Sequence, residues 1–319
     1  MPGGAKRVPR VSVVMSCYNK GKYLRESIPT VLNQSFSDFE FVVFDNKSTD
    51  DSAAIIGEFQ DPRIRFFQNS RNLGPVASLN NCIETACGEY LVFFHGDDLW
   101  EESFLETNVR YLERFDSINV CHSYMHSIDD GGDRRLCLPA KPGTPYEVAA
   151  WQDALKRLFK SNFVQTPTVV YRRKAMPYFD FRYTYAGDWD MYLRLAAAGN
   201  DFLFINEGLI YYRTSTGSET SIGMRDGNLI VECYFVLRSF FNAYPAYRGW
   251  RSRCFKRMSG SILRRTRTVD SREQAFFLMR CSILCFPLQL FSPVFHTYLL
   301  LGLLFGPGGL RLLKRSGKK

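Results

Sequence analysis

Two neighbouring carboxylates, Asp97 and Asp98, follow a run of apolar residues from Tyr90 to Phe94. Such a run predicts a strand that is buried on both faces, and open α/β sheets bind ligands at the carboxyl ends of their strands. Adjacent carboxylates repel each other unless a cation lies between them. Because Mg²⁺ binds carboxylate and phosphate oxygens, the pair predicts a metal–diphosphate site. A solvated turn that caps the helix beginning near Glu101 is the alternative.

Polar segments also follow the other predicted strands of the first hundred residues. They are Ser16 to Asn19 after strand 11–16, Asp45-Asn46 after strand 39–44, and Arg71 to Gly74 after strand 64–67. Parallel strands all point the same way, so these loops can converge with Asp97 and Asp98 on one crevice. Tyr18 offers a ring face to a base, and Asn46 can donate and accept hydrogen bonds at a base edge. A packed surface aromatic and an ordinary Asx turn are the alternatives.

Strand and helix patterns alternate four times up to residue 94, with short connections. This alternation predicts a doubly wound, Rossmann-like, mostly parallel sheet flanked by helices. Neither a G-x-G-x-x-G fingerprint nor a G-x-x-x-x-G-K-[ST] phosphate loop is present. If the crevice binds a nucleotide, it must use residues other than a dinucleotide-binding fingerprint or a P-loop.

In these segments the chain resembles the family-2 inverting glycosyltransferases of GT-A fold. The matching pieces lie in order within roughly residues 8–220, and they are 11–19, 45–50, 72–74 with Asn80, and 86–90 leading into Asp97-Asp98. The resemblance implies Mg²⁺ or Mn²⁺ held by Asp98 and Asp97. It also implies that a nucleotide diphosphate sugar is bound by Ser16, Tyr18, Asn19, Asp45, Asn46, Arg71, Asn80, Asp97 and Arg213.

This chain departs from the family pattern at two positions. Asn46 stands where many members have an Asp that contacts uracil, so thymidine and guanosine diphosphate sugars stay open as donors. His95 stands where many members have a further Asp, and it can contact the diphosphate or play a structural role.

A second acidic segment, Gly187-Asp188-Trp189-Asp190, begins a predicted helix. It resembles the family's helix start whose Asp is the general base, and we assign that role to Asp188. The acceptor hydroxyl must lose its proton as it attacks the anomeric carbon, and a single displacement inverts that centre. The alternatives are that Asp188 only caps the helix and that Asp190 is the base. Arg194 is expected to pack under the site.

Two further segments lie near the predicted crevice. A strand over 209–215 contains Arg213, which either contacts phosphate or forms an ion pair with the body of the protein. The segment Pro139 to Tyr146 contains three prolines and predicts an irregular loop near the acceptor.

The charge is unevenly distributed along the 319 residues. Residues 244–319 contain 15 Lys and Arg but two Asp and Glu, a net charge of +13, and the whole chain carries +9, so residues 1–243 carry −4. Residues 281–310 contain no Asp, Glu, Lys or Arg, but three prolines interrupt them. Broken apolar helices flanked by basic residues predict docking on the lipids of the inner membrane face. A spanning or re-entrant helix, or a helix buried in a homodimer or core, is the alternative, and nucleic acid is not expected.

The remaining composition favours a reduced, cytosolic protein. The nine cysteines show no paired spacing, and residues 1–10 contain no apolar segment typical of a secretory signal. We therefore expect a catalytic domain over 1–225 and a helical membrane-associating region over 226–319, attached peripherally at the cytosolic face.

Together these features predict a metal-dependent inverting glycosyltransferase that acts on a lipid-linked glycan in cell-surface polysaccharide or glycolipid synthesis. Sugar transfer to a polyprenyl phosphate is an enzymatic alternative with the same donor site. A non-catalytic, membrane-bound sugar-nucleotide-binding protein is the alternative from another class.

Overall fold

The structure, a computed structural model, describes residues 8–136, 143–214, 219–269 and 271–313. Its contacts divide the chain into two units. The N-terminal unit comprises Met1–Arg157 and Phe163–Ser218, and the C-terminal unit comprises Leu158–Asn162 and Glu219–Lys319. The short segment Leu158–Asn162 belongs to the C-terminal unit although it lies between two parts of the other, which the sequence did not predict.

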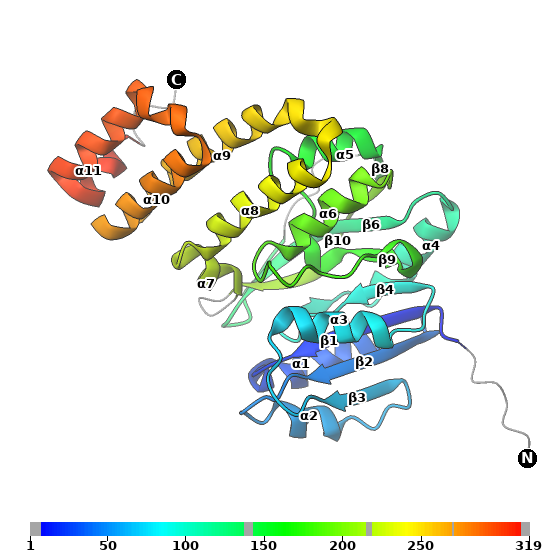
Figure 1. The fold of residues 1–319 in the computed structure, drawn as a ribbon. Helices are drawn as coiled ribbons and strands as arrows, with labels where there is room; N and C mark the ends of the chain where they lie inside the picture. The colour runs from blue at the N-terminus through cyan, green and yellow to red at the C-terminus, as the bar shows by residue number, and fades with distance from the viewer. Residues whose placement is uncertain (1–7, 137–142, 215–218, 270, 314–319) are drawn as a thin grey trace, which may run out of the picture. The chain divides into compact units, whose positions relative to one another are not determined.

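Strands and helices alternate through the first part of the chain (Figure 1), in the order β1 (Val11–Cys17), α1 (Gly21–Leu32), β2 (Phe39–Asp45), α2 (Ser52–Glu58), β3 (Ile64–Gln68), α3 (Pro75–Thr85) and β4 (Tyr90–Phe93). The elements that follow, up to the last strand, are β5 (Leu99–Trp100), α4 (Phe104–Arg114), β6 (Val120–Asp129), β7 (Arg134–Arg135), β8 (Tyr146–Ala149), α5 (Trp151–Leu158), η1 (Thr166–Thr168), β9 (Val170–Arg172), η2 (Arg173–Ala175), α6 (Gly187–Ala197) and β10 (Phe202–Thr214). The loop expected over 139–146 lies partly outside the described residues, and Tyr146 begins β8.

The strands form one mixed sheet in the order β3-β2-β1-β4-β9-β6-β10-β5. The pairs β2–β3, β1–β2 and β1–β4 are parallel, as the alternating pattern predicts. Beyond β4 the sheet is mixed rather than mostly parallel, because β9 runs antiparallel to both β4 and β6 whereas β6 and β10 are parallel.

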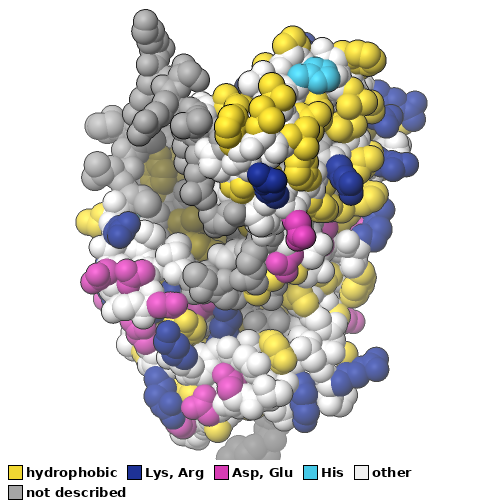
Figure 2. Space-filling model, turned by 90° about the vertical axis from the view of Figure 1, so that its left-hand side faces the viewer, with side chains coloured by type: hydrophobic (Ala, Val, Ile, Leu, Met, Phe, Trp, Pro, Cys, Tyr) yellow, Lys and Arg dark blue, Asp and Glu magenta, His cyan; other side chains and the backbone are white. Residues whose placement is uncertain are grey.

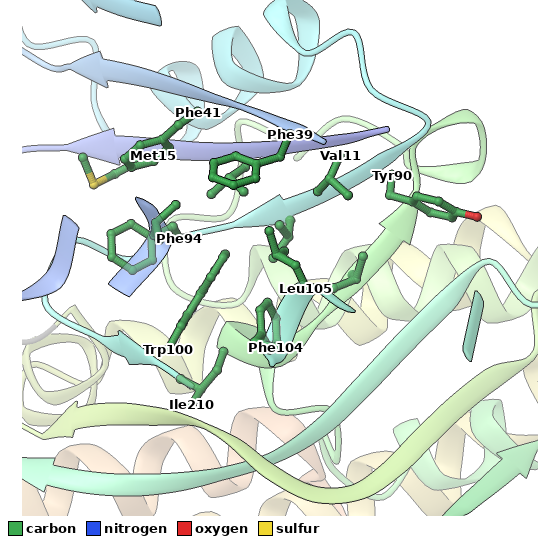
Figure 3. Close-up of a cluster of buried hydrophobic side chains, with 14 of the residues drawn as sticks. Val11, Met15, Phe39, Phe41, Tyr90, Phe94, Trp100, Phe104, Leu105 and Ile210 are labelled. Carbon is green, nitrogen blue, oxygen red and sulfur yellow. The ribbon is translucent and has the colours of Figure 1, made fainter. Parts of the chain in front are cut away.

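The main core lies against one face of this sheet, where side chains of β1, β2 and β4 meet those of α1 and α4. Figure 3 shows part of this core, including Phe94 and Trp100. Their rings pack edge to face with centroids 5.1 Å apart, in a geometry that aromatic pairs favour. Because Phe94 and Trp100 flank residues 95–99, their contact fixes both ends of the turn that contains Asp97 and Asp98.

The C-terminal unit is helical, with the elements α7 (Glu219–Arg225), α8 (Asn228–Ala243), η3 (Pro245–Trp250), α9 (Arg251–Arg265), α10 (Arg272–Cys285), η4 (Pro287–Phe291) and α11 (Pro293–Leu312). Gly306 has a φ of 59°, which glycine adopts readily, and it kinks α11 just before Pro307. Within the described parts of the chain, no helix combines the length and hydropathy needed to cross a bilayer.

Candidate functional site

The turn after β4 presents one buried and one partly exposed carboxylate. The Asp98 side chain is 1% exposed, and its Oδ1 accepts a hydrogen bond from the main-chain N–H of Arg213 at 2.9 Å. Asp98 Oδ2 is buried and accepts no hydrogen bond from any described residue, although His95 Nδ1 lies 3.3 Å away. Burial raises the pKa of the Asp98 carboxyl, which His95 opposes and the negative charge of Asp97 reinforces. Among the described residues, Asp98 Oδ2 thus has the nearby His95 ring as an ionisable neighbour but no hydrogen bond of good geometry.

Asp97 already has a cation beside it, because Lys20 Nζ lies 2.6 Å from Asp97 Oδ2. Burial alone would lower the pKa of the Lys20 ammonium, but the attraction of Asp97 and Asp98 outweighs burial and the pKa is raised. The main-chain N–H of Lys20 donates to Ser52 Oγ at 2.9 Å, which fixes the start of α1. The sequence reasoning missed Lys20, although it follows Asn19 directly in the first crevice loop.

Arg213 is 4% exposed and fixes the same turn from β10. Its guanidinium donates to Asp97 O at 2.8 Å, to Asp129 O at 3.0 Å and to Glu26 Oε2 at 2.7 Å. These contacts correspond to the ion-pair alternative raised from the sequence. They give Arg213 a positioning role, and direct phosphate contact by Arg213 stays a prediction.

Asn46 is also occupied by internal hydrogen bonds. Its Nδ2 donates to Asn72 Oδ1 at 3.0 Å and to Gly74 O at 3.2 Å, while its Oδ1 accepts from Asn69 Nδ2 at 3.0 Å and from Leu73 N at 2.9 Å. These four bonds use the whole capacity of a side-chain amide. Asn46 therefore holds the loop between β3 and α3 in place, and its predicted contact with a base is not tested by this geometry.

The other residues predicted to bind the nucleotide sugar form two groups: some side chains are hydrogen-bonded within the protein, and others are exposed. Asp45 is fully buried and accepts from Ser48 N at 3.2 Å and from Gln68 Nε2 at 2.9 Å. Asn19 adopts a φ of 52°, and its Oδ1 accepts from Thr49 N at 2.8 Å. Ser16 Oγ donates to Ser78 Oγ at 2.7 Å.

Tyr18 and Arg71, which are predicted to bind the nucleotide sugar, remain available to a ligand at this edge of the sheet. The Tyr18 side chain is 43% exposed at the end of β1. Arg71 is exposed in the loop before α3 and contacts no acceptor among the described residues. An exposed ring and an unpaired guanidinium are the groups that a base and a phosphate would use.

Asn80 lies on α3 and connects the sheet to the segment before α6. It is 8% exposed, and its amide donates to Phe179 O at 3.0 Å and accepts from Phe179 N at 2.9 Å. This two-way pairing gives Asn80 a role in fixing residue 179, and its predicted contact with the nucleotide sugar stays a prediction.

Asp188 is the second residue of α6 and is partly buried. Its Oδ2 accepts a hydrogen bond from Thr166 Oγ1 at 2.6 Å, and its Oδ1 accepts from Trp189 N at 2.7 Å. The rival carboxylate, Asp190, is buried and forms an ion pair with Arg194 at 2.8 Å. Burial raises the pKa of Asp190 and Arg194 opposes this rise. Asp190 is thus paired with a cation within its own helix, and the assignment of the base to Asp188 stays a prediction.

The carboxylates at this edge suit a metal that also binds phosphate. Across the described ranges, no group of three His, Cys, Asp or Glu side chains could hold a metal ion alone. Mg²⁺ does not require such a cage, because it commonly uses one or two carboxylates together with water and phosphate oxygens. The unpaired Asp98 Oδ2 fits this requirement directly, and Asp97 could contribute only beside Lys20.

Comparisons with known proteins agree with this geometry. The model of glycosyl transferase family 2 matches residues 12–177. An uncharacterized glycosyltransferase of Methanocaldococcus jannaschii is 34% identical over 64% of this chain and 71% of its own length. The amylovoran biosynthesis glycosyltransferase AmsB of Erwinia amylovora is 27% identical over 64% of this chain and 70% of its own.

The fold has a counterpart among solved structures. Residues 1–349 of TarS from S. aureus, crystallised in complex with UDP-GlcNAc, align with a TM-score of 0.68 and 18% identity over 96% of this chain and 91% of that chain. The mixed sheet flanked by helices is thus a GT-A fold. The chain belongs to glycosyl transferase family 2.

Proposed function

We propose that this glycosyltransferase is an inverting, metal-dependent enzyme that moves a sugar from a nucleotide diphosphate donor to a hydroxyl of a lipid-linked glycan. The observation that carries the proposal is the buried Asp98 carboxylate after β4, whose Oδ2 lies near His95 but has no hydrogen bond among the described residues. A buried carboxylate oxygen without a hydrogen bond is costly, and a bound cation would compensate it. The donor of TarS, UDP-GlcNAc, and the polysaccharide pathway of AmsB support the class of donor and product.

The donor would lie along the carboxyl edge of β1 to β4. Tyr18 offers its exposed ring to the base, and Arg71 offers a guanidinium to a phosphate. Asp98, with Asp97 beside it, would hold Mg²⁺ or Mn²⁺, and such an ion stabilises the charge that builds on a departing diphosphate. Asn46, Asn80 and Arg213 keep the surrounding loops in position through the contacts described above.

Asp188 takes the proton of the acceptor hydroxyl as that oxygen attacks the anomeric carbon. The hydrogen bonds from Thr166 Oγ1 and Trp189 N orient the carboxylate. A single displacement of this kind needs one carboxylate base and inverts the anomeric centre. The pairing of Asp190 with Arg194 is consistent with one base in this segment.

The C-terminal unit supports an acceptor that is embedded in a membrane. Large apolar side chains lie exposed along η4 and α11, including Phe291 at 81%, Leu304 at 59% and Phe305 at 61%. Figure 2 shows hydrophobic side chains gathered over the C-terminal helices. Residues 281–310 carry no charge and are flanked by arginines and lysines. Such a surface can enter the headgroup region of an anionic bilayer without spanning it.

Donor binding and transfer can be tested separately with two amide variants. A panel of nucleotide sugars with Mn²⁺ should raise the melting temperature of the parent for one donor. Asp98→Asn should lose this stabilisation. Asp188→Asn should retain it but lower kcat by about 10²- to 10⁴-fold, the usual contribution of a general base.

The control is Asp116→Asn, which removes a carboxylate whose side chain is 97% exposed and should leave both measurements unchanged. If Asp98→Asn and Asp188→Asn both transfer sugar like the parent, the assignment of the site is wrong. Metal-independent donor binding with full transfer would remove the metal from the proposal and leave Asp188 in place.

A further inference from the structure

A cavity of about 490 Å³ lies in the second half of the sheet, away from the Asp97-Asp98 turn in sequence. Its walls include His122 and Tyr124 of β6, Phe204 of β10, Phe163, Gln165 and Arg157. His122 and Tyr124 are two residues apart on one strand, so they share a face of the sheet, and Phe204 is the strand partner of His122. The volume is within the range of roughly 300–1,000 Å³ that small-molecule sites occupy.

Aromatic rings form much of the wall. The Phe204 ring centroid lies 4.6 Å from that of Tyr124 and 5.1 Å from that of His122. The Phe163 ring lies 5.9 Å from His122 on another side and is covered by the Arg157 guanidinium at 4.0 Å. Sugar rings carry flat patches of C–H groups that pack against such rings, while their hydroxyls need polar partners at the edges.

Polar partners of this kind are present and unused. His122 is 3% exposed, and its buried Nδ1 has no hydrogen-bond partner among the described residues. An unsatisfied buried nitrogen costs free energy unless a ligand or water pairs with it. Burial, with a smaller contribution from Arg157, lowers the pKa of His122 to about 3. The ring is therefore neutral at physiological pH and suits an uncharged hydroxyl.

Gln165 supplies a second polar group with a fixed orientation. Its Oε1 accepts a hydrogen bond from Met125 N at 2.6 Å, which determines which side of the amide carries the N–H groups. Those N–H donors have no acceptor in the described ranges of the chain. They are therefore available to a ligand hydroxyl in the cavity.

One residue of the cavity wall is next in sequence to the residue that contacts the proposed base. Gln165 is followed by Thr166, whose hydroxyl donates to Asp188 Oδ2 at 2.6 Å. The same turn is held to β6 because Thr168 Oγ1 accepts from Ser123 N at 3.0 Å and donates to Ser123 O at 3.1 Å. A ligand bound to Gln165 thus lies one residue from the group that orients Asp188.

We propose that this cavity binds an uncharged sugar ring of the acceptor, packed against Tyr124 and Phe204 and hydrogen-bonded by His122 Nδ1 and the Gln165 amide. The assignment rests on the proposed function, because it takes Asp188 as the base toward which the acceptor is directed. It adds the chemical class of the acceptor unit and the residues that select it.

The binding step can be measured without turnover. A panel of methyl glycosides (glucoside, galactoside, rhamnoside and N-acetylglucosaminide) is titrated onto the full chain and followed by saturation-transfer NMR. At least one glycoside is expected to bind the parent. Tyr124→Leu removes a packing surface, and Gln165→Glu keeps the acceptor for Met125 N while removing the N–H donors. Both should weaken that glycoside at least tenfold.

The matched control is Gln152→Glu, which makes the same change at an exposed position of α5 and should bind like the parent. Donor-induced thermal stabilisation should be the same in all these variants. Absence of binding by every glycoside, or equal binding by parent, Tyr124→Leu and Gln165→Glu, overturns the assignment. Loss of nucleotide binding in Tyr124→Leu would assign the cavity to the donor and also overturn it.

Failure of this inference and of the proposed function can be told apart. If glycosides bind the cavity but Asp188→Asn still transfers sugar, the cavity assignment stands and the base assignment fails. If Asp188→Asn abolishes transfer but no glycoside binds, the base assignment stands and the acceptor unit lies elsewhere.

Discussion

The two units of this protein differ in which kinds of side chain they bury and which they expose. In the N-terminal unit, charged and amide side chains such as Arg213 and Asn46 are buried and almost fully hydrogen-bonded. In the C-terminal unit, large apolar side chains such as Leu288 and Phe291 are exposed, at 62% and 81%. The first pattern costs desolvation energy that only good pairing repays, and the second leaves apolar surface in water.

The difference indicates what each unit is adapted to contact. Buried, satisfied polar groups fix a few loops rigidly. Asp98 Oδ2 is among the few buried polar atoms of the described residues without a hydrogen bond, and it lies at the predicted metal site. A concentration of exposed apolar side chains in one segment marks a surface that another apolar phase covers. The comparison therefore separates a unit that contains the predicted site residues from a unit whose exposed apolar surface we propose as a membrane contact.

The largest expected effect tests whether the exposed apolar side chains of the C-terminal unit enter a membrane, as we propose. Four exposed residues are changed together, in the variant Leu284→Ser, Leu288→Ser, Phe291→Ser and Phe305→Ser. If each side chain contributes about 1 kcal/mol on entering a bilayer interface, the variant loses about 4 kcal/mol, roughly a thousandfold in partitioning. Co-sedimentation with vesicles of anionic phospholipid measures this change.

The control for this experiment is Leu136→Ser with Phe181→Ser, which are 67% and 71% exposed in the N-terminal unit. That variant should bind vesicles like the parent. If both variants bind equally, or if the parent stays in the supernatant at low salt, the exposed surface of the C-terminal unit is not a membrane surface.

A smaller effect tests the network of the N-terminal unit. Arg213→Met leaves Asp97 O and Asp129 O without their donor and should lower the free energy of unfolding by about 3 kcal/mol. Denaturant unfolding measures the change. Arg71→Met, at an exposed and unpaired arginine, should stay within about 0.5 kcal/mol of the parent. A loss below about 1 kcal/mol for Arg213→Met would contradict its positioning role.

The smallest expected effect is on the pH dependence of the free energy of unfolding. The pKa of His122 is about 3 in the folded chain and about 6.5 in the unfolded chain. As the pH falls below 6.5, the unfolded chain binds the proton first, so stability decreases until about pH 3. Between pH 7.5 and 5 the parent should lose about 2 kcal/mol more than His122→Leu. Denaturant unfolding at each pH measures these losses of stability. Equal losses in the two proteins would show that His122 is not held neutral.

The sequence predicted the first half of the fold well because its signals are local. Strands 11–16, 39–44, 64–67 and 90–94 each appear within a residue or two of β1 to β4. In the second half the prediction was incomplete. The strand expected over 209–215 begins at Phe202. Polar and aromatic residues break the apolar pattern there, because β6 and β10 have one face at the cavity.

For the site, the sequence identified the residues but not which of them are occupied. The positions of Asp97, Asp98 and Asp188 follow from strand ends and a helix start. The four hydrogen bonds of Asn46 and the three acceptors of Arg213 do not, because their partners lie between 23 and 187 residues away. Lys20 was missed for the same reason, since its partner Asp97 is 77 residues away.

The sequence alone therefore determined the family, the carboxylates at the sheet edge and the basic, apolar character of the last helices, because residue type and short spacing encode these features. The tertiary structure alone decided which carboxylate oxygen lacks a hydrogen bond, which polar residues serve as scaffold and where an aromatic cavity lies. Those properties depend on distances between segments far apart in the chain, and burial makes each unpaired polar atom energetically significant.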